Sequence, residues 1–181
     1  MLTIHQANGD EHREAARDLF AEYLHAACPV CDREYGVGFD AEAILEHDMT
    51  DLGVFRPPGG RLLLAYERED SAEDLAAAGI ACVRTIGGRT AEIKRMYVRP
   101  ALRRRGIGRA LVDVAVEEMR AAGCARLRLD SARFMADAHS LYHAAGFREI
   151  EPYPESEVPP AFRAHWVFME LPLGEDRGSV P

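Results

Sequence analysis

At residues 103–108 the chain contains the stretch Arg103-Arg104-Arg105-Gly106-Ile107-Gly108, and a helical pattern from Arg109 to Ala122 follows directly. The two glycines let backbone N–H groups approach a ligand closely, because glycine has no Cβ and adopts conformations closed to other residues. The N–H groups of the first helical turn have no partner within the helix and carry the positive end of its dipole. This stretch, called the Arg-Gly loop below, therefore predicts a binding site for a phosphate or pyrophosphate group.

The composition shows that this positive charge is local. The chain has 181 residues, of which 48% are hydrophobic, and a formal net charge of -8. A nucleic-acid backbone is bound by distributed Lys and Arg side chains, so we expect no nucleic-acid partner. No apolar run approaches the ~20 residues of a membrane span, and residues 1–5 lack the pattern of a signal peptide. We therefore expect a single-domain, cytoplasmic protein with no membrane partner.

Hydrophobic periodicity predicts three consecutive strands before the Arg-Gly loop. Residues 61–66 and 80–86 are continuous apolar runs, and a polar, helix-prone insert (67–78) joins them. Such short apolar runs are typical of central strands. Gly87-Gly88 then has the spacing of a tight hairpin turn into a third run, residues 89–98.

The third run contains an irregularity. Its apolar residues occupy odd positions first and even positions later, namely Ala91 and Ile93, then Met96 and Val98. A β-bulge around Lys94-Arg95 would explain this change of phase. The alternative is a regular strand in which Tyr97 continues the odd phase and Met96 is half-buried.

Beyond the loop, the helical pattern stops at Gly123, and residues 126–130 alternate as a strand. Strand, helix and strand in this order predict a parallel crossover unit. Residues 166–171 predict a last strand, and the tail from Gly174 is expected to be disordered.

The N-terminal third is predicted to be helical with an irregular middle. Asp10 can cap a helix that runs to about Ala26, and Asp40 can begin a second helix. Between them, residues 27–38 contain Cys28-Pro29-Val30-Cys31, which has the C-x-x-C spacing of redox and metal sites. A zinc site would normally need a second pair. We therefore expect reduced thiols in a loop and no metal.

A strand-helix-strand unit with two glycines also suggests a dinucleotide-binding fold, which would make the protein an NAD(P)-dependent oxidoreductase. Gly106 and Gly108 fit the first half of that motif, but its third glycine position is Leu111. Seven residues separate Val98 from Gly106, whereas the dinucleotide turn follows its strand directly. The Walker pattern is absent, because Leu111-Val112-Asp113 stands where Gly-Lys-Ser/Thr is required.

The loop resembles the acyl-CoA motif Q/R-x-x-G-x-G/A of the GCN5-related N-acetyltransferases (GNAT family), which Arg103-x-x-Gly106-x-Gly108 matches. The stretch Leu141-Tyr142-His143-Ala144-Ala145-Gly146-Phe147 is similar to the later L-Y-x-x-x-G-F element of the family. The resemblance covers roughly residues 61–150. It implies an α/β (α+β) fold with a mixed, mostly antiparallel sheet, a parallel strand pair splayed at the acyl-CoA site, and flanking helices. Residues 1–172 would form one domain, and residues 173–181 a flexible tail.

The resemblance also implies how acetyl-CoA is held. The strand before the loop would bind the pantetheine arm through its backbone, and the loop N–H groups would bind the pyrophosphate. A freed backbone N–H at Tyr97 or Met96, beside the bulge, could stabilise the oxyanion of acyl transfer. The cofactor residues implied in this way are Met96, Tyr97, Val98, Arg103, Arg104, Arg105, Gly106, Ile107, Gly108 and Arg109.

Two catalytic residues follow from the same resemblance. Glu92 lies fourteen residues before Gly106, where histone-acetylating members of the family place their general base. An acceptor amine with a pKa near ~10.4 must lose a proton before it attacks. Tyr142 is the candidate acid for the departing thiolate. The asparagine that many members carry seven residues earlier is Met135 here, so its hydrogen bonds to the cofactor would be lost.

The acceptor is expected to contact residues outside these motifs, because loops commonly carry specificity. Acidic and aromatic groups there suit a cationic amine of a small molecule or a protein. The candidates are Glu34, Tyr35, Phe39, Asp130, Tyr153, Glu155 and Glu157. Asp130 could instead cap a helix, and the surface carboxylates could simply be solvated. The chain could act as a homodimer, and an acyl-CoA sensor without turnover is the alternative to an acetyltransferase.

Overall fold

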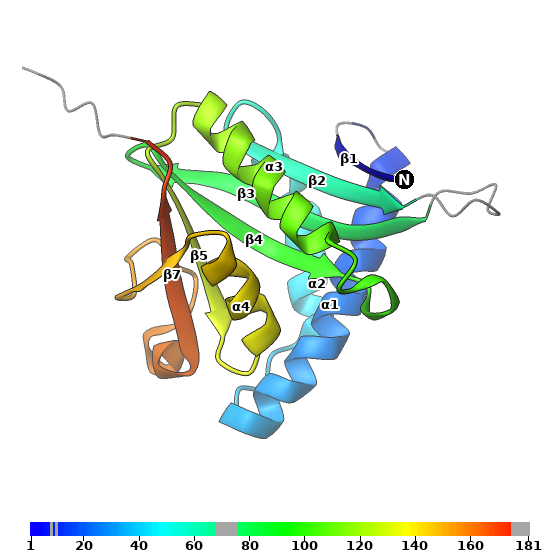
Figure 1. The fold of residues 1–181 in the computed structure, drawn as a ribbon. Coiled ribbons are helices and arrows are strands. Elements are labelled where there is room, and N and C mark those ends of the chain that lie inside the picture. Colours follow the sequence, from blue (N-terminus) through cyan, green and yellow to red (C-terminus); the bar gives the residue numbers. More distant parts are fainter. Residues whose placement is uncertain (8, 10, 68–75, 175–181) are drawn as a thin grey trace, which may run out of the picture.

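The computed structural model of the protein describes residues 1–7, 9, 11–67 and 76–174 (Figure 1). The predicted cap Asp10, most of the predicted insert 67–78 and most of the predicted tail lie outside the described residues. The helices are α1 (Glu11–Tyr35), α2 (Ala41–Thr50), α3 (Ile107–Ala121) and α4 (Ala136–Ala144), with short 3-10 turns at Leu52–Phe55, Pro100–Leu102 and Pro160–His165. The strands are β1 (Leu2–Gln6), β2 (Gly60–Glu67), β3 (Ala77–Gly87), β4 (Thr90–Val98), β5 (Arg126–Ala132), β6 (Arg148–Ile150) and β7 (Trp166–Pro172).

The strands form one mixed sheet in the order β1-β2-β3-β4-β5-β7-β6. Only β4 and β5 are parallel, and the other neighbouring pairs are antiparallel. The predicted hairpin between β3 and β4 is confirmed, with Gly87, Gly88 and Arg89 all at positive φ. The predicted crossover from β4 through α3 to β5 is confirmed as well, so the mixed sheet with its single parallel pair is the fold expected from the sequence.

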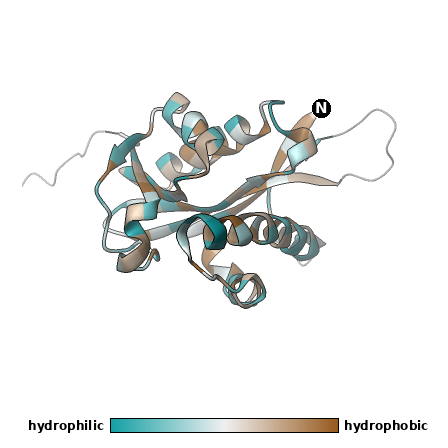
Figure 2. Ribbon diagram, turned by 90° about the horizontal axis from the view of Figure 1, so that it is seen from below, coloured by the Kyte–Doolittle hydropathy of each residue, from teal (hydrophilic) through white to brown (hydrophobic). Residues whose placement is uncertain are grey.

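Helices cover both faces of the sheet (Figures 1 and 2). The core on one face contains α3 and Tyr142 of α4, while the core on the other contains α1 and α2. Helix α3 packs because its apolar residues recur every three or four positions. Ile107, Leu111 and Ala115 are all 1% exposed or less. Each fully buried Leu or Ile side chain stabilises the fold by about 1.5–3 kcal/mol.

The irregularity in β4 is a β-bulge, as the phase change predicted. Ile80 pairs with Tyr97 and Cys82 with Lys94, so Arg95 and Met96 of β4 lie opposite the single residue Ala81 of β3. Arg95 takes up the extra residue in the left-handed region, with φ 48. The bulge turns the end of β4 away from the sheet, since bulges bend and twist the strand that carries them.

The parallel pair is short and then opens. Pairing of β4 with β5 is confined to residues 90–93 and 126–129. Beyond these four pairs, β5 continues along β7 while β4 continues along β3. The opening between Lys94 of β4 and Asp130 of β5 lies directly beside the bulge.

One prediction about the N-terminal third is wrong. Residues 27–35 are not irregular but continue α1, with Pro29 inside the helix. Proline lacks the N–H that would bond four residues back, so the sequence favoured a break there. Packing outweighs this preference, because Cys28 and Cys31 of the same segment are buried at 7% and 4% exposure. Among the described residues, no helix combines the length and apolarity needed to cross a membrane.

Candidate active site

A cavity of about 530 Å³ occupies the opening between β4 and β5. Its wall includes Met135, Ala138 and Tyr142 from the α3–α4 face of the sheet. It also includes residues of α1 and α2 from the opposite face, among them Tyr23 and Ile44. The cavity therefore passes through the plane of the sheet, which is possible only because the two strands separate there.

The Arg-Gly loop lies between the end of β4 and the N-terminus of α3. Arg104 and Gly106 adopt positive φ values of 62 and 84, and Gly106 is the N-cap residue without a side-chain hydrogen bond to the helix. The first-turn N–H groups of α3 therefore point to the loop without a side-chain cap. A Cβ on Gly108 would lie 3.2 Å from Leu141 Cδ2 and 3.5 Å from Met96 Cε, so even a methyl group here would press on Leu141 and a long side chain would displace its neighbours.

The loop arginines differ in what they contact. Arg103 donates from Nε to the carbonyl of Val98 at 3.0 Å, and Arg105 forms an ion pair with Glu67 at 3.1 Å. Arg109 is paired with Asp113 at 2.8 Å. The exposed Arg104 guanidinium has no partner within the described part of the chain, so it is the most available of these cations for an anionic ligand.

The backbone of β4 offers donors toward the opening. Arg99 N–H donates to the carbonyl of Ala78 at 3.0 Å, and Tyr97 pairs with Ile80, so both residues face β3. Successive N–H groups of a strand point to opposite edges. The N–H groups of Met96 and Val98 therefore face away from β3 and toward the opening.

Comparison with known proteins identifies this arrangement. Residues 13–147 match the family model described as "Acetyltransferase (GNAT) family". The chain belongs to the GNAT family of acetyltransferases. The IAA acetyltransferase of Azospirillum brasilense is 32% identical over 142 residues, which are 78% of this chain and 85% of that relative. An uncharacterized N-acetyltransferase of Schizosaccharomyces pombe is 27% identical over 158 residues, 87% of this chain and 86% of the relative.

Solved GNAT structures share the fold. A GNAT acetyltransferase from Staphylococcus aureus Mu50 superposes with a TM-score of 0.72 at 18% identity, covering 96% of this chain and 100% of that one. The yncA protein of Salmonella typhimurium, solved with its cofactor acetyl-CoA, superposes with a TM-score of 0.66 at 21% identity over 98% and 96% of the two chains. These likenesses confirm the predicted fold, and membership of the family displaces the dinucleotide-binding interpretation.

Tyr142 lies on the cavity wall beside Met96 of β4. Its hydroxyl lies 3.5 Å from Met96 Sδ, which is a weak contact, and its ring packs against Phe147 at 5.7 Å between centroids. Burial raises the pKa of Tyr142 well above its usual range. The phenol is therefore protonated at neutral pH.

Glu92 lies behind the cavity wall rather than on it. Its side chain is 0% exposed. Tyr153 donates its hydroxyl to Glu92 Oε1 at 2.7 Å, and Arg84 donates to Oε2 from Nη2 at 3.0 Å. Burial raises the pKa of Glu92, while Lys94 and Tyr153 act in the opposite direction. Both oxygens are thus engaged inside the protein.

Asp130 does line the cavity, at the point where β5 leaves β4. Its Oδ2 accepts a hydrogen bond from Ser156 Oγ at 2.9 Å and lies 3.9 Å from Lys94 Nζ. No donor to Oδ1 is found among the described residues. One carboxylate oxygen is therefore available to a ligand.

Of the other residues predicted to contact the amine acceptor, some line the cavity and some do not. Phe39 lines the cavity, and its ring meets Trp166 edge to face at 6.1 Å. Tyr35 instead stacks on His165 at 4.6 Å, and exposed Glu34 pairs with Arg33 at 3.0 Å. Neither of them, nor Tyr153, contributes to the cavity wall.

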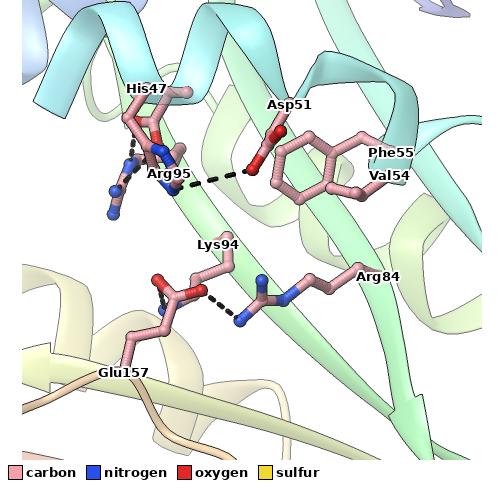
Figure 3. Close-up of a pocket in the computed structure, with 9 residues that line it drawn as sticks. His47, Asp51, Val54, Phe55, Arg84, Lys94, Arg95 and Glu157 are labelled. Atoms are coloured by element: carbon pink, nitrogen blue, oxygen red, sulfur yellow. Dashed lines mark hydrogen bonds and ion pairs between the residues drawn. The ribbon is translucent and has the colours of Figure 1, made fainter.

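Two residues of this region were not singled out from the sequence. Tyr23 reaches the cavity from α1. Asp48 of α2 lines a smaller adjoining recess and binds Arg95 through both carboxylate oxygens. Glu157, an acidic candidate from the sequence, does line the cavity and enters from the segment between β6 and β7 (Figure 3). The signal for Asp48 was indirect, because a long cationic side chain at a predicted bulge requires a buried anion if it points inward.

The thiols of Cys28 and Cys31 also line the cavity and are free. Burial raises the pKa of both, that of Cys31 to about 11. They are therefore protonated at neutral pH and poor nucleophiles. Within the described residues, no group of three or more His, Cys, Asp or Glu is close enough to hold a metal ion.

Proposed function

We propose that the protein transfers an acetyl group from acetyl-CoA to a primary amine by direct attack in a ternary complex. The observation that carries the proposal is the cavity through the sheet. Its wall joins Met96 and Tyr142 on the side of the Arg-Gly loop to Asp130 on the side of α1 and α2. Donor and acceptor would meet beside the bulge, where the reacting atoms can be held at close range.

The Arg-Gly loop fits the pyrophosphate of CoA. Its uncapped first-turn N–H groups, the positive φ of Gly106 and the unpartnered Arg104 together provide donors and positive charge for an anion. The N–H groups of Met96 and Val98 would bind the amide groups of the pantetheine arm. Acetyl-CoA supplies the activated thioester, and the residues of this chain position it and move protons.

Charge that develops on the thioester oxygen needs a donor near the bulge. Of the two candidates from the sequence, the N–H of Met96 is favoured because Tyr97 pairs with Ile80 of β3. A preorganised backbone donor of this kind commonly accounts for a large part of the rate. Tyr142, protonated at neutral pH, would donate to the departing thiolate.

Asp130 is the proposed partner of the acceptor ammonium. Asp130 lines the cavity and its Oδ1 has no donor among the described residues, whereas Glu92 is enclosed by Arg84 and Tyr153. We therefore propose that Asp130 takes the proton, directly or through water, and that Glu92 acts at a distance by holding Arg84 and Tyr153. The aromatic rings of Phe39 and Trp166 on the same wall suit a cationic acceptor.

Substitution of Gly108 tests the donor site. The variant Gly108→Arg should abolish acetyl-CoA binding in calorimetry, because any side chain there would meet Leu141 and Met96. Gly174→Arg adds the same charge where no atom lies within 4 Å and should bind acetyl-CoA as the unmodified protein does. Unchanged affinity in Gly108→Arg would refute the site. Acetyl-CoA binding without acetylation of any amine in a panel would favour the sensor alternative.

A further inference from the structure

The side chain of Glu157 occupies an anion-binding position formed by two cations. Its Oε1 lies 2.6 Å from Arg84 Nη2, and its Oε2 lies 3.2 Å from Lys94 Nζ. Each carboxylate oxygen thus has its own cation, which is the geometry in which proteins bind the carboxylate of a ligand. Burial alone would raise the pKa of Glu157, but Lys94 and Arg84 lower it to about 2.

This position opens onto the proposed acceptor site. Glu157 and Lys94 line the main cavity and also an adjoining recess of about 60 Å³, which Arg84 lines as well (Figure 3). The side chain of Glu157 is 50% exposed, whereas that of Lys94 is 9% exposed. The carboxylate therefore comes from the solvent side and covers a cation that is otherwise buried.

The segment that carries Glu157 is fixed by its neighbours. Residues 151–159 place Tyr153 on Glu92 and Ser156 on Asp130, at 2.7 Å and 2.9 Å. Glu157 is thus held over Arg84 and Lys94 by two anchors that precede it in the segment. Without it, Arg84 would keep Glu92 at 3.0 Å, but Lys94 would keep only Glu92 at 3.8 Å and Asp130 at 3.9 Å.

We infer that Glu157 is a specificity-determining residue, an internal carboxylate that takes the place of an acceptor carboxylate and restricts acetylation to amines that carry none. This inference rests on the proposed function and adds the class of acceptor to it. An amino acid entering the cavity would find Arg84 and Lys94 already paired and would bring its carboxylate close to that of Glu157. Like charges at short range disfavour the wrong ligand, while a cationic amine is attracted by Glu157 and Asp130.

Matched acceptors that differ only by a carboxylate test the inference. The pairs are phenylalanine with phenethylamine, ornithine with putrescine, and lysine with cadaverine, and the measurement is kcat/KM with acetyl-CoA. The unmodified protein should prefer the decarboxylated member of each pair. In Glu157→Ala, the ratio of kcat/KM for the amino acid to that for the amine should rise by about tenfold or more, as expected when a like charge is removed and Arg84 and Lys94 each lose one anionic partner.

Two further variants separate charge from folding. Glu157→Gln removes the charge with little change in volume, so it carries the test if Glu157→Ala does not fold. Glu151→Gln removes an exposed carboxylate of the same segment that contacts no cation among the described residues, and it should leave the ratio unchanged. An unmodified protein that accepts both members of each pair equally, or an unchanged ratio in both Glu157 variants, would overturn the inference.

Binding of acetate provides a readout that does not depend on turnover. Calorimetry should detect acetate binding to Glu157→Ala and none to the unmodified protein. If no amine is acetylated at all, the proposed function fails, but acetate binding still decides whether Arg84 and Lys94 form the anion site. If amines are acetylated and acetate binds neither protein, the inference alone fails.

Discussion

At the scale of single residues, two carboxylates in the same charged network have different surroundings. Glu92 is fully buried with both oxygens engaged, while Asp130 lines the cavity and has a described hydrogen-bond donor at Oδ2 alone. A group that takes a proton from an acceptor must lie within hydrogen-bond reach of it or of one intervening water. Asp130 lines the cavity, which is why we propose it for this role, whereas Glu92 is separated from the cavity by its own partners.

The two carboxylates are distinguished by the pH dependence of their variants. Asp130→Asn should lower kcat/KM for the amine by about 10² at neutral pH and less at high pH, because an amine of pKa ~10.4 is then largely deprotonated without help. Glu92→Gln should lower the rate by a similar factor at all pH values and destabilise the fold by about 1–3 kcal/mol, since Arg84 and Tyr153 lose a charged partner. Rate profiles and urea denaturation measure these effects, with Glu151→Gln as the control. A pH-dependent loss in Glu92→Gln alone would restore Glu92 as the base.

The sequence predicted some of these residues and not others. The Arg-Gly loop, Tyr142 and Asp130 lie within matched motifs or at a strand end, so local pattern was sufficient to single them out. Tyr23 lies in a segment without a recognisable motif and reaches the cavity only through tertiary packing. Glu157 is a candidate from the sequence only as an acidic side chain, and its two cationic partners depend on tertiary packing. The sequence predicts an irregular stretch at residues 27–38 that could bring Glu34 and Tyr35 to the acceptor, but the continuation of α1 directs them elsewhere.

At the scale of secondary-structure elements, the bulge in β4 is joined to α2. Arg95 has a φ of 48, which is unfavourable for a residue with a side chain, and its guanidinium binds Asp48 through Nε and Nη2, the latter at 3.0 Å. The two side chains are 20% and 10% exposed. Arg95 thus forms both the backbone irregularity of β4 and a contact with helix α2 on the other side of the cavity.

A double-mutant cycle measures this connection. Asp48→Ala should destabilise the protein by about 3 kcal/mol, because it leaves the Arg95 cation buried without its partner. Arg95→Gly loses the same pair but relieves the strained φ. The two changes together should therefore cost clearly less than the sum of the single changes in urea denaturation. Additive costs would show that the pair does not couple the bulge to α2.

The element scale also shows what a single sequence can and cannot predict. The change of phase between Ile93 and Met96 predicted the bulge, because side-chain alternation in a strand has a fixed period of two. The short edge strand β6 follows the L-Y-x-x-x-G-F element, where the family resemblance implies a strand, but hydrophobic alternation alone did not predict it. It has only three residues, and its pairing with β7 depends on a partner about twenty positions along the chain.

At the scale of the whole molecule, the cavity lies between two unequal parts of one sheet. Strands β1 to β4 form one part with α1 and α2, and strands β5 to β7 form the other with α4. Hydrophobic patterns in the sequence predicted the crossover that joins the two parts. The resemblance to the GNAT family implied that the parallel strands β4 and β5 separate at the acyl-CoA site. The depth of the cavity depends on side chains from both faces, and no local pattern in the chain reports how such distant segments meet.

Only four residue pairs are described between β4 and β5, whereas the neighbouring strand pairs are longer. This short pairing resists local opening less than the longer antiparallel pairings on either side, because fewer hydrogen bonds must break together. A ligand that contacts both β4 and β5 would hold the two parts of the sheet together. Acetyl-CoA should therefore slow hydrogen-deuterium exchange at residues 96–98 and 130–132 more than in β1 and β2, and Gly108→Arg should show no such slowing. Equal protection throughout the sheet would mean that the two parts already move as one body without the ligand.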